Sequence, residues 1–210
     1  MPTERASEVL YTLLLAVGLS VAIPAPLAAQ DFELLEATIE DAHSAMEDGR
    51  ITCRSLVQGY IDRIEAFDQT GPRLNAIQHL NQRALDKADS LDASMRSTGI
   101  SGPLHCIPVL LKDQVETADM PTTYGSALFQ DFVPTRDATI TTRMRAAGAI
   151  ILAKTTMGEF ASRYVGSAFG VIRNAYDPDR NPSGSSGGTA TGIAASFGMV
   201  GIGEDTGGSV

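Results

Sequence analysis

Gly203-Glu204-Asp205-Thr206-Gly207-Gly208-Ser209 ends one residue before the last position of the sequence, and Pro182-Ser183-Gly184-Ser185-Ser186-Gly187-Gly188 precedes it. A run of small and apolar residues, 189–197, joins these two Gly/Ser loops and predicts a short helix. Two glycines before a serine allow successive backbone N–H groups to point at one spot, as an oxyanion hole requires. A tight turn with a surface serine and a flexible linker are the alternatives. The loops are the first candidate site of the chain.

Lys112 is the second candidate. It follows the short apolar run Ile107-Pro108-Val109-Leu110-Leu111, which is bounded by turn residues and predicts a buried strand. A lysine at the end of a buried strand costs free energy unless it is paired or neutral, and a neutral lysine can act as a general base. On this residue alone, a lysine that extends to water is the simpler alternative.

Helical periodicity and short apolar runs alternate along the rest of the chain. Helices are expected over 35–46, 57–64, 82–95 and 137–144. Thr52 or Ser55 is expected to cap the second of these helices, and Asp137 the last. Further buried strands are expected over 149–153 and 198–202. Buried strands alternating with helices predict an α/β fold, with a parallel or mostly parallel sheet covered by helices on both faces.

The charge of the chain restricts its partners. The 210 residues carry a formal net charge of -9. A surface of this sign repels phosphate backbones and anionic lipid headgroups, so neither a nucleic-acid partner nor a membrane-surface role is expected.

The motifs do not indicate a metal or a cofactor. No lysine follows the glycines of 182–188 as a Walker loop requires, and Gly201-Ile202-Gly203 lacks the third glycine of a dinucleotide fingerprint. Cys53 and Cys106 have no C-x-x-C partner and no histidine at metal-ligand spacing. We therefore expect no metal and no cofactor. The two cysteines could pair in an oxidising compartment, but the sequence does not place their Cα atoms within reach, so we interpret them as two free buried thiols.

The first residues are typical of a secretory leader. Residues 9–30 contain no charge, Pro24 and Pro26 interrupt the apolar stretch, and Leu27-Ala28-Ala29 supplies small residues for cleavage. An uncleaved anchor is the alternative, but the segment is short for a membrane span. We expect residues 1–29 to be a signal peptide. The product would be periplasmic or secreted, with no stable membrane span after processing.

A Ser-His-Asp triad has no clear candidate in the sequence. His43 and His79 are expected in helical segments, and His105 precedes the lysine strand without an obvious orienting carboxylate. Such a triad would require a histidine beyond Val210.

Taken together, the motifs resemble the amidase signature family, in which a Lys–cis-Ser–Ser triad is embedded in a Gly/Ser-rich stretch. The resemblance covers most of the chain after the leader. In order, it rests on Gly71-Pro72, Leu74-Asn75-Ala76-Ile77, Gly102-Pro103-Leu104, Ile107-Pro108, Lys112-Asp113, Thr122-Thr123-Tyr124-Gly125-Ser126, Ala153-Lys154-Thr155, Met157-Gly158-Glu159-Phe160 and the two serine loops. Because several independent motifs occur in one order, the chain is identified as a member of this family, whose sheet is mixed and mostly parallel.

The resemblance implies a role for each matching residue. Ser209 would be the acyl-accepting nucleophile, Ser185, which follows a cis peptide bond in the family, would relay the proton, and Lys112 would be the base. Ser186 would support this network through hydrogen bonds. The oxyanion hole would be formed by the backbone amides of Thr206, Gly207, Gly208 and Ser209. The implied activity is hydrolysis of the C–N bond of a small-molecule amide through a serine acyl-enzyme.

The chain departs from the commonest family pattern at Cys106, Ser183 and Glu204, which replace two glycines and a small hydroxyl residue. None of these is a triad position. The extra carboxylate of Glu204 can tune the electrostatics of the site, which bears on substrate preference rather than on mechanism.

The resemblance also bears on completeness. In the family, the domain continues well past the nucleophile and supplies the rest of the sheet and much of the acyl pocket. We therefore expect residues 30–210 to be the incomplete N-terminal part of a single amidase domain. A sheet that ends there has an open edge, so this part alone is expected to be unstable or inactive.

Two other functions compete with an exported amidase. A glutamyl-tRNA amidotransferase-like subunit shares the signature, but the leader and the acidic charge favour a protein that does not work on tRNA. An inactive truncated relative could act as a binding module, but all three triad residues are present.

Overall fold

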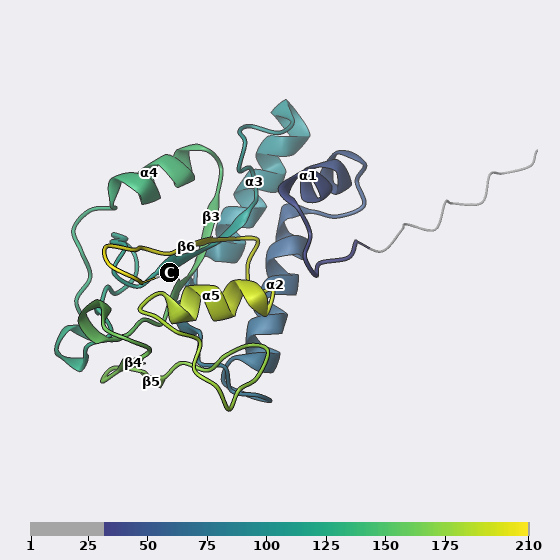
Figure 1. Cartoon of the computed structure of the whole chain (residues 1–210). Helices are drawn as coiled ribbons and strands as arrows, with labels where there is room; N and C mark the ends of the chain where they lie inside the picture. Colours follow the sequence, from purple (N-terminus) through teal and green to yellow (C-terminus); the bar gives the residue numbers. More distant parts are fainter. Residues whose placement is uncertain (1–31, 210) are drawn as a thin grey trace, which may run out of the picture.

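The computed structural model describes residues 32–209 of the chain (Figure 1). The predicted signal peptide, 1–29, lies outside these residues. Within them, no helix has the length and apolar character that crossing a membrane requires.

A four-stranded sheet organises the described residues. Its strands follow the order β1 (Ile77–Leu80), β3 (Ile150–Thr155), β2 (Pro108–Lys112) and β6 (Val200–Ile202). β1 is antiparallel to β3, whereas β3, β2 and β6 are mutually parallel. The prediction of a mostly parallel sheet is therefore confirmed, with one antiparallel edge strand.

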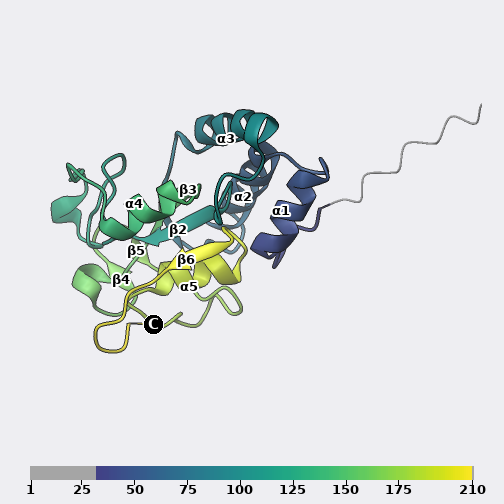
Figure 2. The same cartoon turned by 90° about the horizontal axis from the view of Figure 1, so that it is seen from above.

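Helices cover both faces of this sheet (Figure 1 and Figure 2). On one face, Leu110 and Leu152 join the core formed with α2 (Cys53–Phe67) and α3 (Ala84–Thr98). On the other face, Val109, Leu111 and Ile151 are buried in a second cluster. Successive strand residues point to opposite faces, so the uninterrupted apolar runs of β2 and β3 fit strands that are buried on both sides.

The helices differ in how their amino-terminal ends are capped. α1 (Ile39–Glu47) begins with a capping box at Thr38, and α2 begins with one formed by Thr52 and Ser55. α4 (Thr139–Ala146) packs Met144 into the second cluster. The prediction that Asp137 caps α4 is wrong, because the N-cap is Ala138 without a side-chain hydrogen bond. The Asp137 carboxylate instead accepts from the Ala118 amide at 2.8 Å.

α5 (Gly187–Ala194) connects the two serine loops and lies along β6. Its carboxyl end is held by Arg63 of α2, whose guanidinium donates to the carbonyl oxygens of Ala195 and Ser196. These carbonyls follow the helix and have no partner within it, so Arg63 fixes the direction in which α5 runs.

Several short elements were not predicted from the sequence. They are β1, a hairpin of β4 (Val165–Gly166) and β5 (Gly170–Val171), and the 3₁₀ turns Ala127–Phe129 and Glu159–Ala161. The expectation that His79 lies in a helix is wrong, because this residue belongs to β1. β1 has four residues, too few to show a period, and its backbone is stabilised by pairing with β3.

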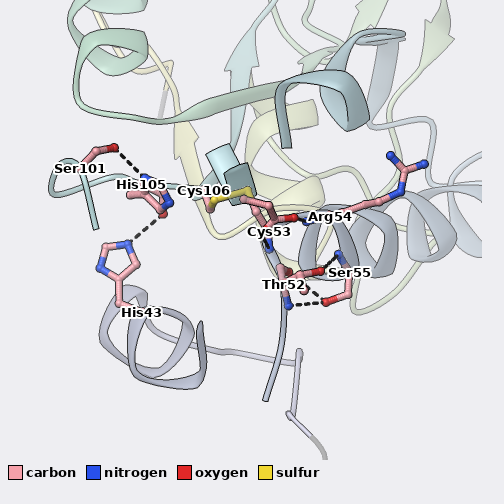
Figure 3. Close-up of a disulfide and its surroundings, with 9 residues drawn as sticks. His43, Thr52, Cys53, Arg54, Ser55, Ser101, His105 and Cys106 are labelled. Atoms are coloured by element: carbon pink, nitrogen blue, oxygen red, sulfur yellow. Dashed lines mark hydrogen bonds between the residues drawn. A yellow bond between two sulfur atoms is a disulfide. The ribbon is translucent and has the colours of Figure 1, made fainter. Parts of the chain in front are cut away.

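The two cysteines form a disulfide (Figure 3), so the expectation of free thiols is wrong. Cys53 opens α2 and Cys106 precedes β2, and their Cα atoms are 5.4 Å apart. Both residues are fully buried. Cys106 has a φ of 64°, the left-handed region in which glycine is favoured. Because 53 positions separate the cysteines, no local pattern could reveal the pairing.

We expect reduction of this disulfide to lower the free energy of unfolding by about 4 kcal/mol, because it releases a long closed loop in the unfolded chain. Urea unfolding of the full chain with and without dithiothreitol measures the effect. The double variant Cys53→Ala/Cys106→Gly is the control and should not respond to reductant. Equal unfolding midpoints for the oxidised and reduced chain would contradict the prediction.

Candidate active site

The carboxyl edge of the parallel strands carries the candidate site. Lys112 is the last residue of β2, the strand between β3 and β6. The loop 203–209 leaves β6 at the same edge, since β2 and β6 are parallel. The loop 182–186 leads into the amino end of α5, the helix that precedes β6. Parallel α/β sheets place their sites at this edge.

Three side chains form a continuous chain of hydrogen bonds there. Lys112 Nζ donates to Ser185 Oγ at 2.7 Å, and Ser185 Oγ donates to Ser209 Oγ at 3.1 Å. Lys112 and Ser185 are fully buried, whereas Ser209 is half-buried. The structure therefore brings together the three residues predicted as a triad, and only the terminal serine is accessible.

The loop that carries Ser185 packs tightly against backbone. The Gly184–Ser185 peptide bond is cis. A Cβ atom at Gly184 would lie 1.9 Å from the carbonyl oxygen of Arg163, and one at Gly188 would lie 2.2 Å from that of Thr156. No side chain fits at these distances. Both glycines are therefore required for the close approach that places Ser185.

Ser186 joins the two serine loops through hydrogen bonds, whereas its supporting role in a reaction stays a prediction. Its backbone N–H donates to the Ser209 carbonyl at 3.1 Å. Its hydroxyl donates to the Glu204 carbonyl at 3.0 Å and accepts from the Glu204 N–H at 3.2 Å. These bonds fix the backbone of the loop that bears Ser209.

Two of the four backbone amides predicted as an oxyanion hole have a side-chain partner in this structure. The N–H groups of Gly208 and Ser209 donate to the Asp205 carboxylate, the latter at 2.9 Å. These bonds, led by that from Ser209, lower the pKa of Asp205. A substrate oxygen at this position would have to displace the carboxylate. The oxyanion hole formed by residues 206–209 stays a prediction.

Glu204 is a site residue that the sequence alone did not place. Its Oε2 atom lies 3.0 Å from Lys112 Nζ and accepts from Gln114 Nε2 at 3.1 Å. Its other carboxylate oxygen accepts from the Thr206 hydroxyl. The Thr206 bond and then the Lys112 bond lower the pKa of Glu204. The sequence marked Glu204 only as a departure from the family pattern, and the fold brings it to Lys112 across 92 positions.

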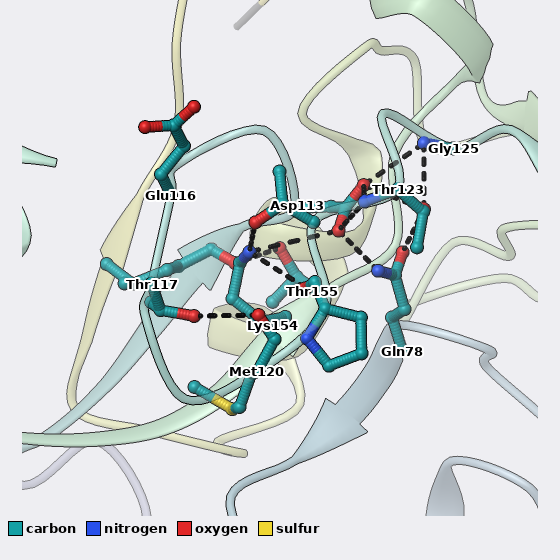
Figure 4. A network of polar contacts seen from close by, with 12 residues as sticks. Gln78, Asp113, Glu116, Thr117, Met120, Thr123, Gly125, Lys154 and Thr155 are labelled. Carbon is teal, nitrogen blue, oxygen red and sulfur yellow. Dashed lines mark hydrogen bonds and ion pairs between the residues drawn. The ribbon is translucent and has the colours of Figure 1, made fainter. Parts of the chain in front are cut away.

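Asp113 follows Lys112 but serves a different network (Figure 4). Its fully buried carboxylate accepts from the amides of Thr123 and Gly125 and from Gln78 Nε2. The equally buried Lys154 Nζ lies 3.9 Å from it. This network ties the end of β2 to the loop 122–125, and so holds the backbone at Lys112 in place.

The histidines belong to other parts of the molecule. His43 Nε2 lies 2.9 Å from the His105 carbonyl oxygen, and His105 Nδ1 bonds the Ser101 hydroxyl, beside the disulfide (Figure 3). His79 packs edge-on against Phe169. Between residues 32 and 209, no histidine hydrogen-bonds Ser185 or Ser209.

The residues described also contain no group of three or more His, Cys, Asp or Glu side chains that could hold a metal ion.

A cleft of about 410 Å³ opens beside Ser209. Its walls are mostly small and apolar, and they include Tyr176, Pro182, Gly184, Ala190, Ile193 and Ala194. The cleft leaves open space next to the accessible serine.

The fold and the site define a class: an α/β protein with a Lys–Ser–Ser hydrogen-bond chain at the carboxyl edge of its sheet. The family model described as Amidase matches residues 55–210. The chain therefore belongs to the amidase family, whose members hydrolyse the C–N bonds of amides.

Individual relatives agree with this assignment. The A subunit of glutamyl-tRNA(Gln) amidotransferase from Alkaliphilus metalliredigens is 43% identical over 178 residues, which cover 83% of this chain and 36% of the relative. The structure of peptide amidase from Stenotrophomonas maltophilia has a TM-score of 0.82 at 40% identity, covering 85% of this chain and 38% of its own. For an amidase family protein from Bacillus anthracis, the TM-score is 0.80 at 34% identity, with coverages of 84% and 37%. The chain thus spans a little over a third of the length of these relatives.

The buried Lys154 predicts a dependence of stability on pH. Burial lowers the pKa of Lys154 to about 8, with Asp113 acting in the opposite direction, whereas an unfolded lysine titrates near ~10.4. Between these values the unfolded state binds more protons, so the free energy of unfolding should rise with pH. Relative to Lys154→Met, we expect a gain on the order of 2 kcal/mol between about pH 8 and pH 10.

Urea unfolding at several pH values measures this difference. Lys87→Met, which removes an exposed lysine, is the matched control and should follow the wild type. Parallel curves for the wild type and Lys154→Met across the whole range would show that Lys154 titrates normally.

Proposed function

We propose that the protein is an amide hydrolase that uses Ser209 as nucleophile, Ser185 as proton relay and Lys112 as base. The observation that carries this proposal is the hydrogen-bond chain from Lys112 Nζ through Ser185 Oγ to Ser209 Oγ, at 2.7 and 3.1 Å. Three segments distant in sequence supply these groups, and only the serine at the end of the chain is accessible.

The proposed reaction has two halves. Ser209 Oγ attacks the amide carbonyl while its proton moves to Ser185, and the Ser185 proton moves to neutral Lys112. As the tetrahedral intermediate collapses, the same relay returns a proton to the leaving nitrogen and the C–N bond breaks. Water then attacks the acyl-enzyme, using the relay again, and releases the carboxylic acid and free Ser209. These steps use side chains of this chain alone.

The backbone amides of the loop 206–209 would stabilise the negative charge on the carbonyl oxygen. In the proposed mechanism the substrate oxygen takes the place that the Asp205 carboxylate holds. The Gly/Ser composition supports this role, because backbone N–H groups can converge on one oxygen only where side chains do not intervene.

An amidotransferase-like role is the second candidate, because the sequence is 43% identical to the A subunit of a glutamyl-tRNA(Gln) amidotransferase. Two observations favour the simple hydrolase. The net charge of -9 does not suit a tRNA partner. The Cys53–Cys106 disulfide fits an oxidising compartment rather than the cytoplasm, where tRNA is charged.

We further propose that residues 1–29 are a cleaved signal peptide, that residues 30–210 belong to one amidase domain, and that the protein acts in the periplasm or outside the cell. The uncharged stretch before Gln30 supports this proposal. The disulfide gives independent support, since such bonds persist mainly in exported proteins.

Labelling with a fluorophosphonate tests the nucleophile. Because residues 30–210 alone are expected to be inactive, the label is applied to the protein with its complete amidase domain. We expect this protein to gain one covalent adduct by intact mass, and its Ser209→Ala variant to gain none. Lys112→Ala should label at least about 100-fold more slowly, because the relay loses the base that finally accepts the proton. Circular dichroism of each variant controls for folding. A folded wild-type chain that remains unlabelled, or a Ser209→Ala chain that labels equally, would refute the assignment.

Expression in a bacterium with an export pathway tests the localisation. We expect the mature protein in the periplasmic or extracellular fraction, with an amino terminus at Gln30 by mass and with no titratable thiols. A variant with Leu14→Arg and Leu15→Arg should remain in the cytoplasm uncleaved, because charges interrupt the apolar leader. Uncleaved wild-type protein in the cytoplasm would contradict the proposal.

A further inference from the structure

The ammonium group of Lys112 has a complete set of partners. Its Nζ atom lies within hydrogen-bond distance of three acceptors: Ser185 Oγ at 2.7 Å, the Glu204 carbonyl oxygen at 3.1 Å and Glu204 Oε2 at 3.0 Å. A charged lysine has three N–H donors and no acceptor, whereas a neutral one has two donors and a lone pair. The surroundings of Lys112 therefore match the charged form.

Glu204 supplies two of these three acceptors and is itself held in place. Gln114 Nε2 donates to the oxygen that faces Lys112, and the Thr206 hydroxyl donates to the other. The Glu204 side chain retains 30% of its exposure, while Lys112 has none. The Glu204 carboxylate thus contacts both the fully buried Lys112 ammonium group and the solvent.

The other charged groups near Lys112 have different partners. Asp113 directs its carboxylate to the amides of Thr123 and Gly125. Lys154, on the neighbouring strand β3, donates to the Thr122 hydroxyl. Asp205 accepts from the amides of its own loop. Among the residues described, Glu204 is the carboxylate that forms an ion pair with Lys112.

We propose that Glu204 is the counter-ion of Lys112: it holds the lysine as an ammonium in the resting site, so that the neutral base appears only at higher pH. The inference rests on the proposed function, in which Lys112 must be neutral to accept a proton. Glu204 is then a positioning residue that acts through Lys112 and sets the pH range of the reaction. A small hydroxyl residue at this position could not supply the charge.

The variant Glu204→Gln separates charge from shape. Glutamine has nearly the same volume and can still accept a hydrogen bond from Lys112, but it carries no charge. If Glu204 served only to pack the loop, this variant would leave the charge state of Lys112 unchanged. Glu204→Asp keeps the charge, and Glu204→Thr removes both charge and reach, so each provides a second comparison.

Lysine NMR with ¹³Cε labelling reads the charge state directly. The signal of Lys112 is assigned by its loss in Lys112→Met. In the full chain, we expect the pH at which Lys112 loses its proton to fall by about one unit in Glu204→Gln and in Glu204→Thr, and to be largely kept in Glu204→Asp. The Lys154 signal and the variant Glu159→Gln, which removes a carboxylate that bonds Ser167 instead, are the controls and should not change. An unchanged Lys112 titration in both uncharged variants would overturn the proposal.

The rate of fluorophosphonate labelling of Ser209 against pH gives the functional consequence. We expect the rising limb of this profile to move to lower pH by the same amount in Glu204→Gln and to return towards the wild type in Glu204→Asp. The two measurements fail separately. A shifted Lys112 titration without any Ser209 labelling keeps the counter-ion and refutes the proposed function. Normal labelling of Ser209 with an unchanged Lys112 titration in Glu204→Gln keeps the proposed function and refutes the counter-ion.

Discussion

The complete burial of Lys112 at the end of β2 is the constraint on which the rest of the site depends. A buried ammonium must have hydrogen-bond acceptors, and β2 itself offers none beyond its own ladder. The acceptors come from Ser185 and Glu204, which lie on two loops separated in sequence by α5. Both loops must therefore converge on the same strand end, and Gly184 and Gly188 permit this approach because they carry no side chain.

Two buried lysines lie on neighbouring strands, and they differ in the solvent exposure of their partners. Lys154 on β3 is surrounded by Asp113 and by the hydroxyl and carbonyl oxygens of Thr122 and Pro121. The side chains of Asp113 and Thr122 are both fully buried. Lys112 on β2 has one partially exposed carboxylate and one serine that leads to the surface. The first lysine holds backbone together, whereas the second is connected to a position that a substrate can reach.

The disulfide contributes to the same arrangement from the opposite end of β2. Cys106 lies two residues before the strand begins, and its bond to Cys53 anchors that end to α2. α2 in turn supplies Arg63, which fixes the carboxyl end of α5. One helix thus holds both the strand that carries Lys112 and the helix that follows Ser185, so the two ends of the hydrogen-bond chain are attached to a common support.

Local patterns in the sequence predicted the buried strands, and the resemblance to the amidase signature family pointed to Lys112, Ser185 and Ser209, which the structure joins in one hydrogen-bond chain. Apolar runs such as that before Lys112 are local signals, and the glycines of the Gly/Ser loops indicate places where the backbone can approach another group closely. No local pattern could place Glu204 against Lys112, since the two residues are 92 positions apart in the sequence.

Three features could be seen only in the folded protein: the Cys53–Cys106 bond, the strand around His79 and the bonds from the Gly208 and Ser209 amides to Asp205. Each of these depends on segments that meet in space, and such meetings have no period or spacing along the chain. The physical reason is that a side chain's partner is set by where the folded backbone places it, while sequence patterns report only its local preference.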